Sequence, residues 1–501
     1  MKNGKKVIII GGGIAGLSAG IHAQMDGFET EIYESHFKPG GMCTTWTRSG
    51  YKIDNCVHWF SCCNPGFQLY KQWVNCGLAG DDVPRVHQQL FYTSELNGQK
   101  ITLWSDLERT RKEMLELSPE DADAINDFIE TTKLETGMQL PTFKPITAVG
   151  LFDLPKMLNT MKPMIKAIKH IGKGDITDYT SRFKHPLLKL VISDFVPNTQ
   201  YATSFIASYA TIACGNGDYP IGGSEKMIEN MVARYESLGG KLYCKSPVAS
   251  VKLEGSAKKS KITSVTLENG TELKADAFIF ATDPHVTFHK FLDYSYMPKG
   301  LKTRYENKKG NPTFTGFHIA FAVDGIFDAV EGAYFYQLKT PIKCANKTVT
   351  RMNIKTYHEY GEGFAPEGHD ILQTHFKMDE ESWKYWTDLR EKNPEVYKAE
   401  KMRIAKEALA DLENHFPAFK GKISIIDTWT PATYTRYTGA YTGSYMTFVK
   451  TEDSGANYIP NTIKGISNAF LASNWLMSPG GLPCAVAEGY FASWYLKRAK
   501  I

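Results

Sequence analysis

KKVIIIGGGIAGLSAGIHAQMDGFETEIYESHFKPGGMCTTWTRSGYKID, residues 5–54, is the stretch that decides the fold. It opens at residues 6–10 with a short run of β-branched apolar side chains, as expected for a buried parallel strand. Three glycines follow in GxGxxG spacing, and apolar residues then recur at a spacing that fits a helix. A second strand is expected at residues 30–33. The stretch therefore predicts a complete βαβ unit.

Each motif residue has a physical role in holding a dinucleotide. Gly11 permits the tight turn, Gly13 lets a pyrophosphate approach the backbone, and Gly16 lets the helix pack closely on the strand. The pyrophosphate would meet the open N–H groups and the positive dipole end of the helix. Glu34, at the end of the second strand, is suited to accept hydrogen bonds from ribose hydroxyls. This context favours dinucleotide binding over a glycine-rich structural turn.

A second glycine-rich turn bears on the choice between FAD and NAD. Pro39-Gly40-Gly41-Met42 is followed by Gly50-Tyr51 and then by Asp54. The βαβ unit with this extension resembles the FAD-binding amine oxidase and phytoene desaturase superfamily, whereas a simple NAD dehydrogenase has no such extension. The resemblance implies that the nucleotide is FAD.

Composition and charge exclude several classes of protein. The chain of 501 residues is 42% hydrophobic and 22% charged, which is ordinary for a water-soluble globular protein, and its net charge of +4 is too small to indicate nucleic-acid binding. No stretch reaches the roughly 18 apolar residues of a membrane span. The first strand leaves no room for a signal peptide, and nine scattered cysteines without C-x-x-C argue against disulfides or zinc. We expect a cytoplasmic protein with reduced thiols and no bound metal.

The sequence pattern alternates between two kinds of segment. Residues 1–75, 215–300 and 416–501 are predicted to form a discontinuous FAD-binding domain, and residues 76–214 and 301–415 a substrate-binding domain. In the second FAD-binding segment, residues 222–225 predict the start of a helix with Ser224 as its N-cap, and Asn269-Gly270 predicts a hairpin. The predicted fold class is α/β: a Rossmann-like FAD-binding domain interleaved with an α+β substrate-binding domain.

The C-terminal part carries a second motif, FLASNWLMSPGGLP at residues 470–483. A strand at 470–473, a Pro/Gly turn and a helix over 484–497 would again present backbone N–H groups at a helix start, suited to polar oxygens of a flavin. The two motifs together resemble the phytoene desaturase, carotenoid isomerase and retinol saturase family, which typically ends in GxW-x-x-PGGG-x-P. Two departures lie near the expected flavin ring, because Asp54-Asn55-Cys56 replaces Asp-x-Gly and Pro479 replaces one glycine.

The resemblance implies an FAD-dependent oxidoreductase that desaturates, saturates or isomerises carbon–carbon bonds of a hydrophobic isoprenoid, polyene or lipid. The flavin would carry the chemistry, and the electron partner stays open among NAD(P)H, quinone and oxygen. The alternatives are an amine oxidase or protoporphyrinogen-oxidase-like flavoenzyme, and a non-catalytic prenyl- or lipid-binding escort protein of the same fold. The residues predicted to bind the cofactor are Gly11, Gly13, Ile14, Ala15, Gly16, Glu34, Gly41, Met42, Val248, Asn474, Leu482 and Pro483.

Three further features have two interpretations each. His58 directly follows the flavin-side motif and is the candidate for proton transfer, with a structural histidine as the alternative. Residues 430–445, rich in hydroxyls and aromatics, either line the substrate face of the flavin or form a packed loop. Cys484 is either redox-active or, more simply, a buried inert thiol.

Residues 153–171 predict an amphipathic helix with an apolar face and four lysines. The simpler interpretation is a lid or core-packing helix with solvated lysines. The other is a helix that lies on an anionic membrane surface, near the entrance for a lipophilic substrate.

Overall fold

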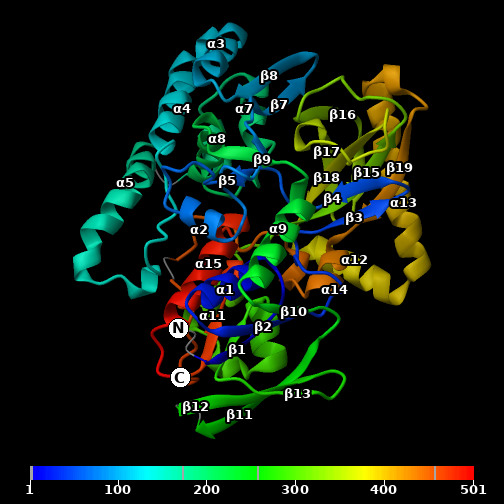
Figure 1. Ribbon diagram of the computed structural model, residues 1–501. Helices are drawn as coiled ribbons and strands as arrows, with labels where there is room; N and C mark the ends of the chain where they lie inside the picture. The colour runs from blue at the N-terminus through cyan, green and yellow to red at the C-terminus, as the bar shows by residue number, and fades with distance from the viewer. Residues whose placement is uncertain (1–3, 172–173, 257–258, 456–457) are drawn as a thin grey trace.

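The computed structural model describes residues 4–171, 174–256, 259–455 and 458–501 (Figure 1). A five-stranded sheet lies in the lower half of that view, and all of its neighbouring strands are parallel. In spatial order its strands are β10 (Lys241–Tyr243), β2 (Glu29–Tyr33), β1 (Lys6–Ile10), β14 (Ala277–Phe280) and β20 (Ala469–Leu471). Segments far apart in the sequence therefore share one sheet, and their carboxyl ends meet at one edge.

Both faces of this sheet are covered, because alternate residues of β1 point to opposite sides. Val7 and Ile9 pack in the core that contains helices α1 (Ile14–Met25), α9 (Gly223–Ser237) and α15 (Leu482–Leu496). Ile8 and Ile10 pack on the other side, against the meander of β11 (Val248–Ser256), β12 (Lys259–Leu267) and β13 (Glu272–Leu273). The predicted βαβ unit and the Asn269-Gly270 hairpin are both confirmed.

A seven-stranded sheet lies at the upper right of Figure 1 and is antiparallel except where β16 pairs with β7. In spatial order it contains β19 (Ile423–Trp429), β15 (Thr315–Val323), β18 (Asp370–Met378), β17 (Lys347–Lys355), β16 (Ala333–Cys344), β7 (Leu90–Leu96) and β8 (Gln99–Trp104). Helices α12 (Glu380–Lys392) and α13 (Pro394–His415) share a core with one of its faces. The opposite face is free to line a cavity.

A helical layer packs against β7 and β8. It contains α3 (Leu107–Leu117), α4 (Ala122–Glu135), α6 (Ile176–Thr180), α7 (Pro186–Ser193) and α8 (Ala202–Ala213), and α5 (Leu154–Ile171) packs against α4. The smaller elements are β3 (Thr45–Arg48), β4 (Tyr51–Asp54), β5 (Phe60–Ser61), α2 (Tyr70–Asn75), β6 (Arg85–Val86), β9 (Gly217–Pro220), α10 (Pro284–Val286), α11 (Lys299–Glu306) and α14 (Pro431–Thr438). Within the described ranges, every helix is too short or too polar to cross a bilayer.

The division into two domains stays a prediction. All strands of the five-stranded sheet come from the segments predicted to form the FAD-binding domain. However, β19 lies in the predicted segment 416–501 and pairs with β15 in the other sheet. The chain thus completes the seven-stranded sheet before it returns to the parallel sheet.

The start of α9 differs from the prediction. Ser224 was expected as the N-cap, but the helix begins at Gly223 and its N-cap residue is Gly222, at φ +83°. The buried carboxylate of Asp54 accepts hydrogen bonds from Ser224 N–H (2.7 Å) and Ser224 Oγ–H (2.6 Å). A charged acceptor from another strand binds the open N–H more strongly than a serine hydroxyl would, so Asp54 takes over the capping role.

We predict that Asp54→Ala lowers the free energy of unfolding by about 3 kcal/mol, since each buried group left unpaired costs roughly 1–3 kcal/mol. The substitution strands the Ser224 groups and the N–H of Cys56, which also donates to Asp54 (3.0 Å). Denaturant unfolding measures the change. Asp81→Ala, at an exposed aspartate, is the matched control and should leave the midpoint unchanged. Equal midpoints for both variants would contradict the capping role.

Candidate functional site

A cavity of about 1660 Å³ opens at the carboxyl edge of the parallel sheet and extends to the seven-stranded sheet. Ligand pockets usually measure roughly 300–1,000 Å³, so this one has room for a dinucleotide and a second molecule. The predicted residues that line it are Gly11, Gly13, Ile14, Ala15, Glu34, Gly41, Met42, His58, Asn474, Leu482 and Pro483. Residues from both ends of the chain therefore meet at one site.

The first glycine turn brings α1 close to β1. Gly11 has φ +104°, and a Cβ there would lie 2.9 Å from the Ala281 carbonyl oxygen. A Cβ at Gly16 would collide with the Gly11 carbonyl oxygen, so the helix needs glycine to start where it does. No side chain caps α1, and Ile14 and Ala15 line the cavity. The N–H groups of this first turn are therefore open to an anionic group such as a phosphate.

The second glycine turn stacks on the first. Gly40 N–H donates to the Gly12 carbonyl oxygen (2.9 Å), and Gly41 has φ +60°. The nearest atom to a Cβ built at Gly13 is Gly41 Cα, at 3.8 Å, so Gly13 leaves space for a ligand between the turns. This space, next to the bare helix start, fits a pyrophosphate.

Glu34 closes one end of this cradle. The residue is 8% exposed, and Oε2 accepts from Gly12 N–H (2.6 Å). Oε1 accepts from His36 N–H (2.8 Å) and from the Ser35 hydroxyl (3.2 Å), so Oε2 is the oxygen with an acceptor direction left for a ribose hydroxyl. The backbone bonds hold the carboxylate in position for that contact.

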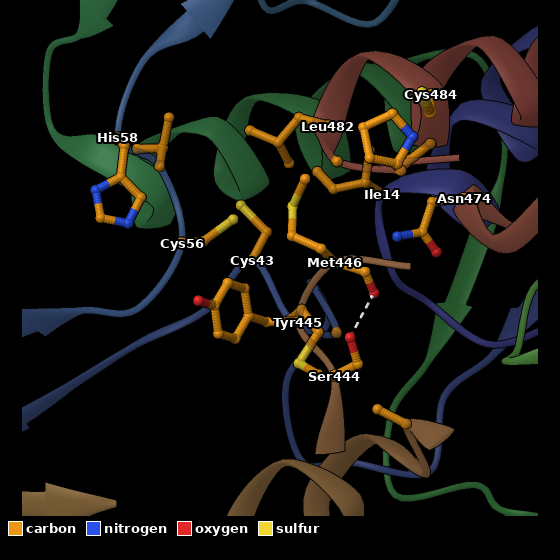
Figure 2. A pocket seen from close by; sticks show the side chains of 18 of the residues that line it. Ile14, Cys43, Cys56, His58, Ser444, Tyr445, Met446, Asn474, Leu482 and Cys484 are labelled. Carbon is orange, nitrogen blue, oxygen red and sulfur yellow. Dashed lines mark hydrogen bonds between the residues drawn. The ribbon is translucent and has the colours of Figure 1, made fainter. Parts of the chain in front are cut away.

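The C-terminal motif forms the other wall. Figure 2 shows Asn474 and Leu482 around the same pocket as Ile14, although they come from opposite ends of the chain. Gly480 and Gly481 have φ +81° and +88°, and α15 begins at Leu482. The wall therefore repeats the arrangement of a glycine turn followed by a helix start, and the residues present fit a flavin dinucleotide.

Two predicted cofactor residues do not line the cavity. Gly16 lies behind the turn, where it allows the close contact with Gly11. Val248 lies at the start of β11 and is buried in the core on the far side of the sheet. Their contacts with a cofactor stay predictions.

A polar cluster, defined here as His58, His318, His375 and Lys355, lies in the part of the cavity bordered by the seven-stranded sheet. His318 pairs directly with His375 across β15 and β18, with ring centroids 5.4 Å apart. The ring of His58 lies 6.4 Å from that of His375. Of these four residues, only His58 is predicted from the sequence. In β15, β17 and β18, apolar side chains that enter the core alternate with side chains that face the cavity. Polar residues at these alternate positions are the signal in the sequence that could have indicated the other three.

Each histidine of the polar cluster has one ring nitrogen in contact with a protein group. His58 Nδ1 lies 3.3 Å from Lys355 Nζ, His375 Nδ1 lies 3.1 Å from Asn353 Nδ2, and His318 Nε2 lies 3.0 Å from the Tyr434 hydroxyl. Burial lowers the pKa of all three, to about 4 for His375 and well below the usual value for the other two. All three imidazoles are therefore neutral at pH 7.

The chemistry of a metal centre is not supported by this cluster. In the part of the chain that the structure describes, no three histidine, cysteine, aspartate or glutamate side chains are grouped to hold a metal ion. The cluster is therefore suited to hydrogen bonding and proton transfer.

The stretch 430–445 lines the cavity instead of forming a loop packed away from it. Tyr434, in α14, and Tyr445 are both cavity residues, and the Tyr434 hydroxyl donates to Asn55 Oδ1 (2.8 Å). Figure 2 shows Tyr445, Ser444 and Met446 along one side of the pocket. Which face of the flavin they meet stays a prediction.

Cys484 also borders the cavity, and its position favours the inert interpretation. Burial raises the pKa of its thiol to about 12, so it stays protonated at neutral pH. Figure 2 shows Cys43 and Cys56 with their sulfur atoms toward one another. The hydrogen bond with Cys56, followed by burial, raises the pKa of the Cys43 thiol well above its usual value. These thiols act as small apolar groups.

A third part of the cavity, the apolar arm, reaches the inner face of α5. Its wall contains Met138, Leu140, Ile146, Met161, Met164 and Ile168. Glu135, at the end of α4, borders it, and neither carboxyl oxygen has a hydrogen-bond partner among the described residues. Burial raises the pKa of Glu135 to about 8, so this carboxyl is neutral at pH 7 and the arm carries no charge.

The chain is similar in sequence to one protein family and to several characterised proteins. The family described as "Flavin containing amine oxidoreductase" matches residues 14–496. The phytoene desaturase (neurosporene-forming) of Rhodobacter capsulatus is 25% identical over 307 residues, 57% of this chain and 54% of that protein. Prolycopene isomerase of Daucus carota is 21% identical, with coverages of 87% and 71%. All-trans-retinol 13,14-reductase of Danio rerio is 22% identical, with coverages of 59% and 49%.

The alignment with the phytoene desaturase spans about half the length of that relative. Among solved structures, wild-type putrescine oxidase has a TM-score of 0.58 at 14% identity, with 98% of each chain covered. Cyclohexylamine oxidase from Brevibacterium oxydans has a TM-score of 0.57 at 13% identity, with 99% of each chain covered. At these identities the structures support the fold alone, and they confirm the predicted α/β class.

We predict that Gly13→Val gives a folded protein without flavin. The Gly13 backbone (φ −74°, ψ −179°) suits valine and its Cβ meets no atom within 3.8 Å, but the γ-methyl groups would occupy the pyrophosphate space. The ratio of flavin absorbance to protein, after incubation with FAD, measures the loss. Gly16→Val is the contrasting variant, since its side chain collides with the Gly11 backbone and should prevent folding. Flavin retained by Gly13→Val would contradict the assignment.

Proposed function

Because the chain belongs to the flavin containing amine oxidoreductase family and its cofactor is FAD, we propose that it is an oxidoreductase acting on carbon–carbon bonds. Its substrate is a hydrophobic isoprenoid, polyene or lipid, which it desaturates, saturates or isomerises. FAD, when bound, supplies two-electron redox chemistry. The chain's own residues bind the cofactor, orient the substrate and exclude water.

The apolar arm is the observation that carries this proposal. Its wall at the inner face of α5 consists of methionine, leucine and isoleucine side chains, its one carboxyl is neutral at pH 7, and the same cavity contains the polar cluster. Such a wall suits a long hydrocarbon and offers a charged molecule no partner. The names of the relatives point the same way, since they refer to phytoene, prolycopene and all-trans-retinol.

The amine oxidase alternative fits the polar cluster less well. Within the described ranges, the charged group in contact with its histidines is the Lys355 ammonium. A protonated amine held there would meet a charge of the same sign in a buried site, where repulsion is weakly screened. The escort-protein alternative requires no flavin. It therefore leaves unexplained why the glycine turns and Glu34 form a complete cradle for a dinucleotide.

We also propose that the protein takes its substrate from a membrane surface through α5. Leu151 and Phe152, just before this helix, are 82% and 100% exposed, and Leu154 and Leu158 on α5 are also exposed. Lysines at 156, 162, 166 and 169 decorate the same helix, which lies at the edge of the molecule in Figure 1. Exposed apolar side chains with lysines around them suit anionic lipid, and the inner face of α5 lines the apolar arm.

The activity is tested by a spectrum and a substrate panel. We expect the purified protein to show flavin absorbance near ~450 nm, the usual band of an oxidised flavin cofactor. Each of phytoene, prolycopene and all-trans-retinol is incubated anaerobically with the oxidised enzyme and with the dithionite-reduced enzyme, and the products are analysed by chromatography. We expect at least one of the three to be converted. Putrescine and cyclohexylamine serve as the contrasting substrates. Turnover of an amine alone would overturn the proposal, and a colourless protein that still binds prenyl lipid would favour the escort protein. Bleaching by NADH or NADPH would identify the electron partner.

The membrane contact is tested by sedimentation with vesicles of phosphatidylcholine and phosphatidylserine. The double substitution Leu151→Asp, Phe152→Asp should weaken binding by more than about tenfold, because burial of each apolar side chain contributes roughly 1.5–3 kcal/mol. Ile326→Asp, at another exposed apolar residue far along the chain, is the matched control. Equal binding of all three proteins would show that the tip of α5 does not meet the bilayer.

A further inference from the structure

His58 lines the cavity, but its protonation state limits what it can do. Its side chain opens onto the interior cavity, and Figure 2 shows it at the end of the pocket away from Asn474. Burial, followed by the charge of Lys355, lowers the pKa of His58 well below its usual value. At neutral pH the ring is therefore an uncharged imidazole, and loss of its one N–H proton would leave an imidazolate anion unless a neighbouring group with a spare proton supplied one.

Lys355 is the nearest group that does hold one. It ends β17, is 6% exposed, and its ammonium donates to the Val57 carbonyl oxygen (3.1 Å) and the Tyr360 hydroxyl (2.7 Å). The third contact of Nζ is His58 Nδ1, at 3.3 Å. An ammonium has donors and no acceptor, so Nδ1 must be the accepting nitrogen. The proton of neutral His58 is therefore on Nε2.

The surroundings bring the pKa of Lys355 close to physiological pH. Burial lowers the pKa of Lys355 to about 8, an effect that Asp54, Glu359 and Cys56 partly offset. Tyr360 and Tyr357 also lie against Nζ, and burial keeps both hydroxyls protonated by raising their pKa. At pH 7 the pair thus consists of an ammonium next to a neutral imidazole.

The other two histidines of the cluster lack such a neighbour. His375 Nδ1 faces the amide nitrogen of Asn353, whose orientation is fixed because Asn353 Oδ1 accepts from the backbone N–H of His375 (3.2 Å). His318 Nε2 faces the hydroxyl of Tyr434, whose pKa burial raises well above its usual value. Neither partner releases a proton at neutral pH. Lys355 with His58 is therefore the pair able to transfer one.

We propose that Lys355 is the proton store of this site and delivers a proton through His58 to a carbon atom of a substrate double bond. The inference rests on the proposed function and gives it a direction, since it assigns the site to addition across C=C. Lys355 acts through His58 and is a positioning residue and proton source, whereas His58 is the group that touches the substrate.

The two carbons of the double bond receive one proton and one hydride. The Nε2–H bond of His58 breaks as a new C–H bond forms, and the Nζ–H bond of Lys355 breaks as Nδ1–H forms, so no imidazolate anion arises. FAD in its two-electron-reduced form, held by the glycine turns and the C-terminal motif, would supply a hydride for the other carbon and would be reoxidised as the double bond is reduced. Solvent then returns one proton to Nε2, and Nδ1 returns its proton to the Lys355 amine.

Two variants separate positioning from proton supply. Lys355→Met removes both the donor and the proton, whereas Lys355→Arg keeps a charged donor that does not release its proton at these pH values. Nitrogen NMR of full-length protein labelled with ¹⁵N-histidine reports the tautomer of His58, whose signals are assigned by their loss in His58→Asn. This readout does not depend on turnover.

In the wild type we expect the Nε2–H tautomer at pH 7, with a change in the His58 signals as pH rises through about 8. Lys355→Met should lose both the tautomer preference and this transition, and Lys355→Arg should keep the tautomer at every pH. A wild-type His58 that carries its proton on Nδ1 at pH 7 would overturn the proposal.

Turnover of all-trans-retinol as the probe tests the delivery step. We expect kcat of the wild type to fall as pH rises through about 8, because the donor is protonated below that value. Both variants should lose about 10²–10⁴-fold in kcat, the usual contribution of a positioned acid, with KM little changed. Wild-type turnover by Lys355→Arg would overturn the proposal. A wild type with the expected tautomer but no reduction of the probe would instead overturn the assigned direction and count against the proposed function.

Discussion

The close approach of α1 to the turn after β1 is the constraint on which the site depends. Gly16 and the Gly11 carbonyl are so near that no side chain fits between them, and this contact fixes where the helix starts. A helix that starts there keeps its first N–H groups bare, since the preceding residues are glycines with no side chain to cap them. The second glycine turn then docks on the first through Gly40. The cradle for the diphosphate is thus made almost entirely of backbone.

This dependence on backbone explains what the sequence made predictable. Glycine spacing, a β-branched run and an acid at the end of a strand are local, so the βαβ unit, the hairpin at Asn269-Gly270 and the C-terminal helix could all be predicted. The polar cluster could not, because His318, His375 and Lys355 meet only through the register of strands that are far apart in the sequence. The same reason hid the cap of α9, which comes from Asp54 and not from the adjacent Ser224.

The cavity joins environments of opposite electrostatic character. At the dinucleotide end, open N–H groups and a fixed carboxylate address charged and hydroxylated parts of a ligand. At the other end, burial keeps the three histidines and Glu135 neutral at pH 7, and the Lys355 ammonium is the one charge of the polar cluster. Transfer of a hydrocarbon from lipid into the apolar arm therefore costs little free energy. A polar molecule that entered the arm would lose its hydration and gain no hydrogen bonds there in return. Selectivity of this kind needs no specific recognition of the substrate's shape.

The contact between the two ends of the chain has a consequence for how the protein acquires its cofactor. β20 and α15, formed by residues after 468, complete the sheet and wall the cavity, and Lys5 Nζ donates to the carbonyl oxygen of Ile501. While the chain is still being synthesised, the N-terminal cradle stands open on the side that this last segment will cover. Stable binding of the flavin therefore requires the segment 469–496, which completes both the sheet and the cavity wall. A chain that stopped before α15 would carry the whole N-terminal nucleotide motif and would lack the second wall of the cavity.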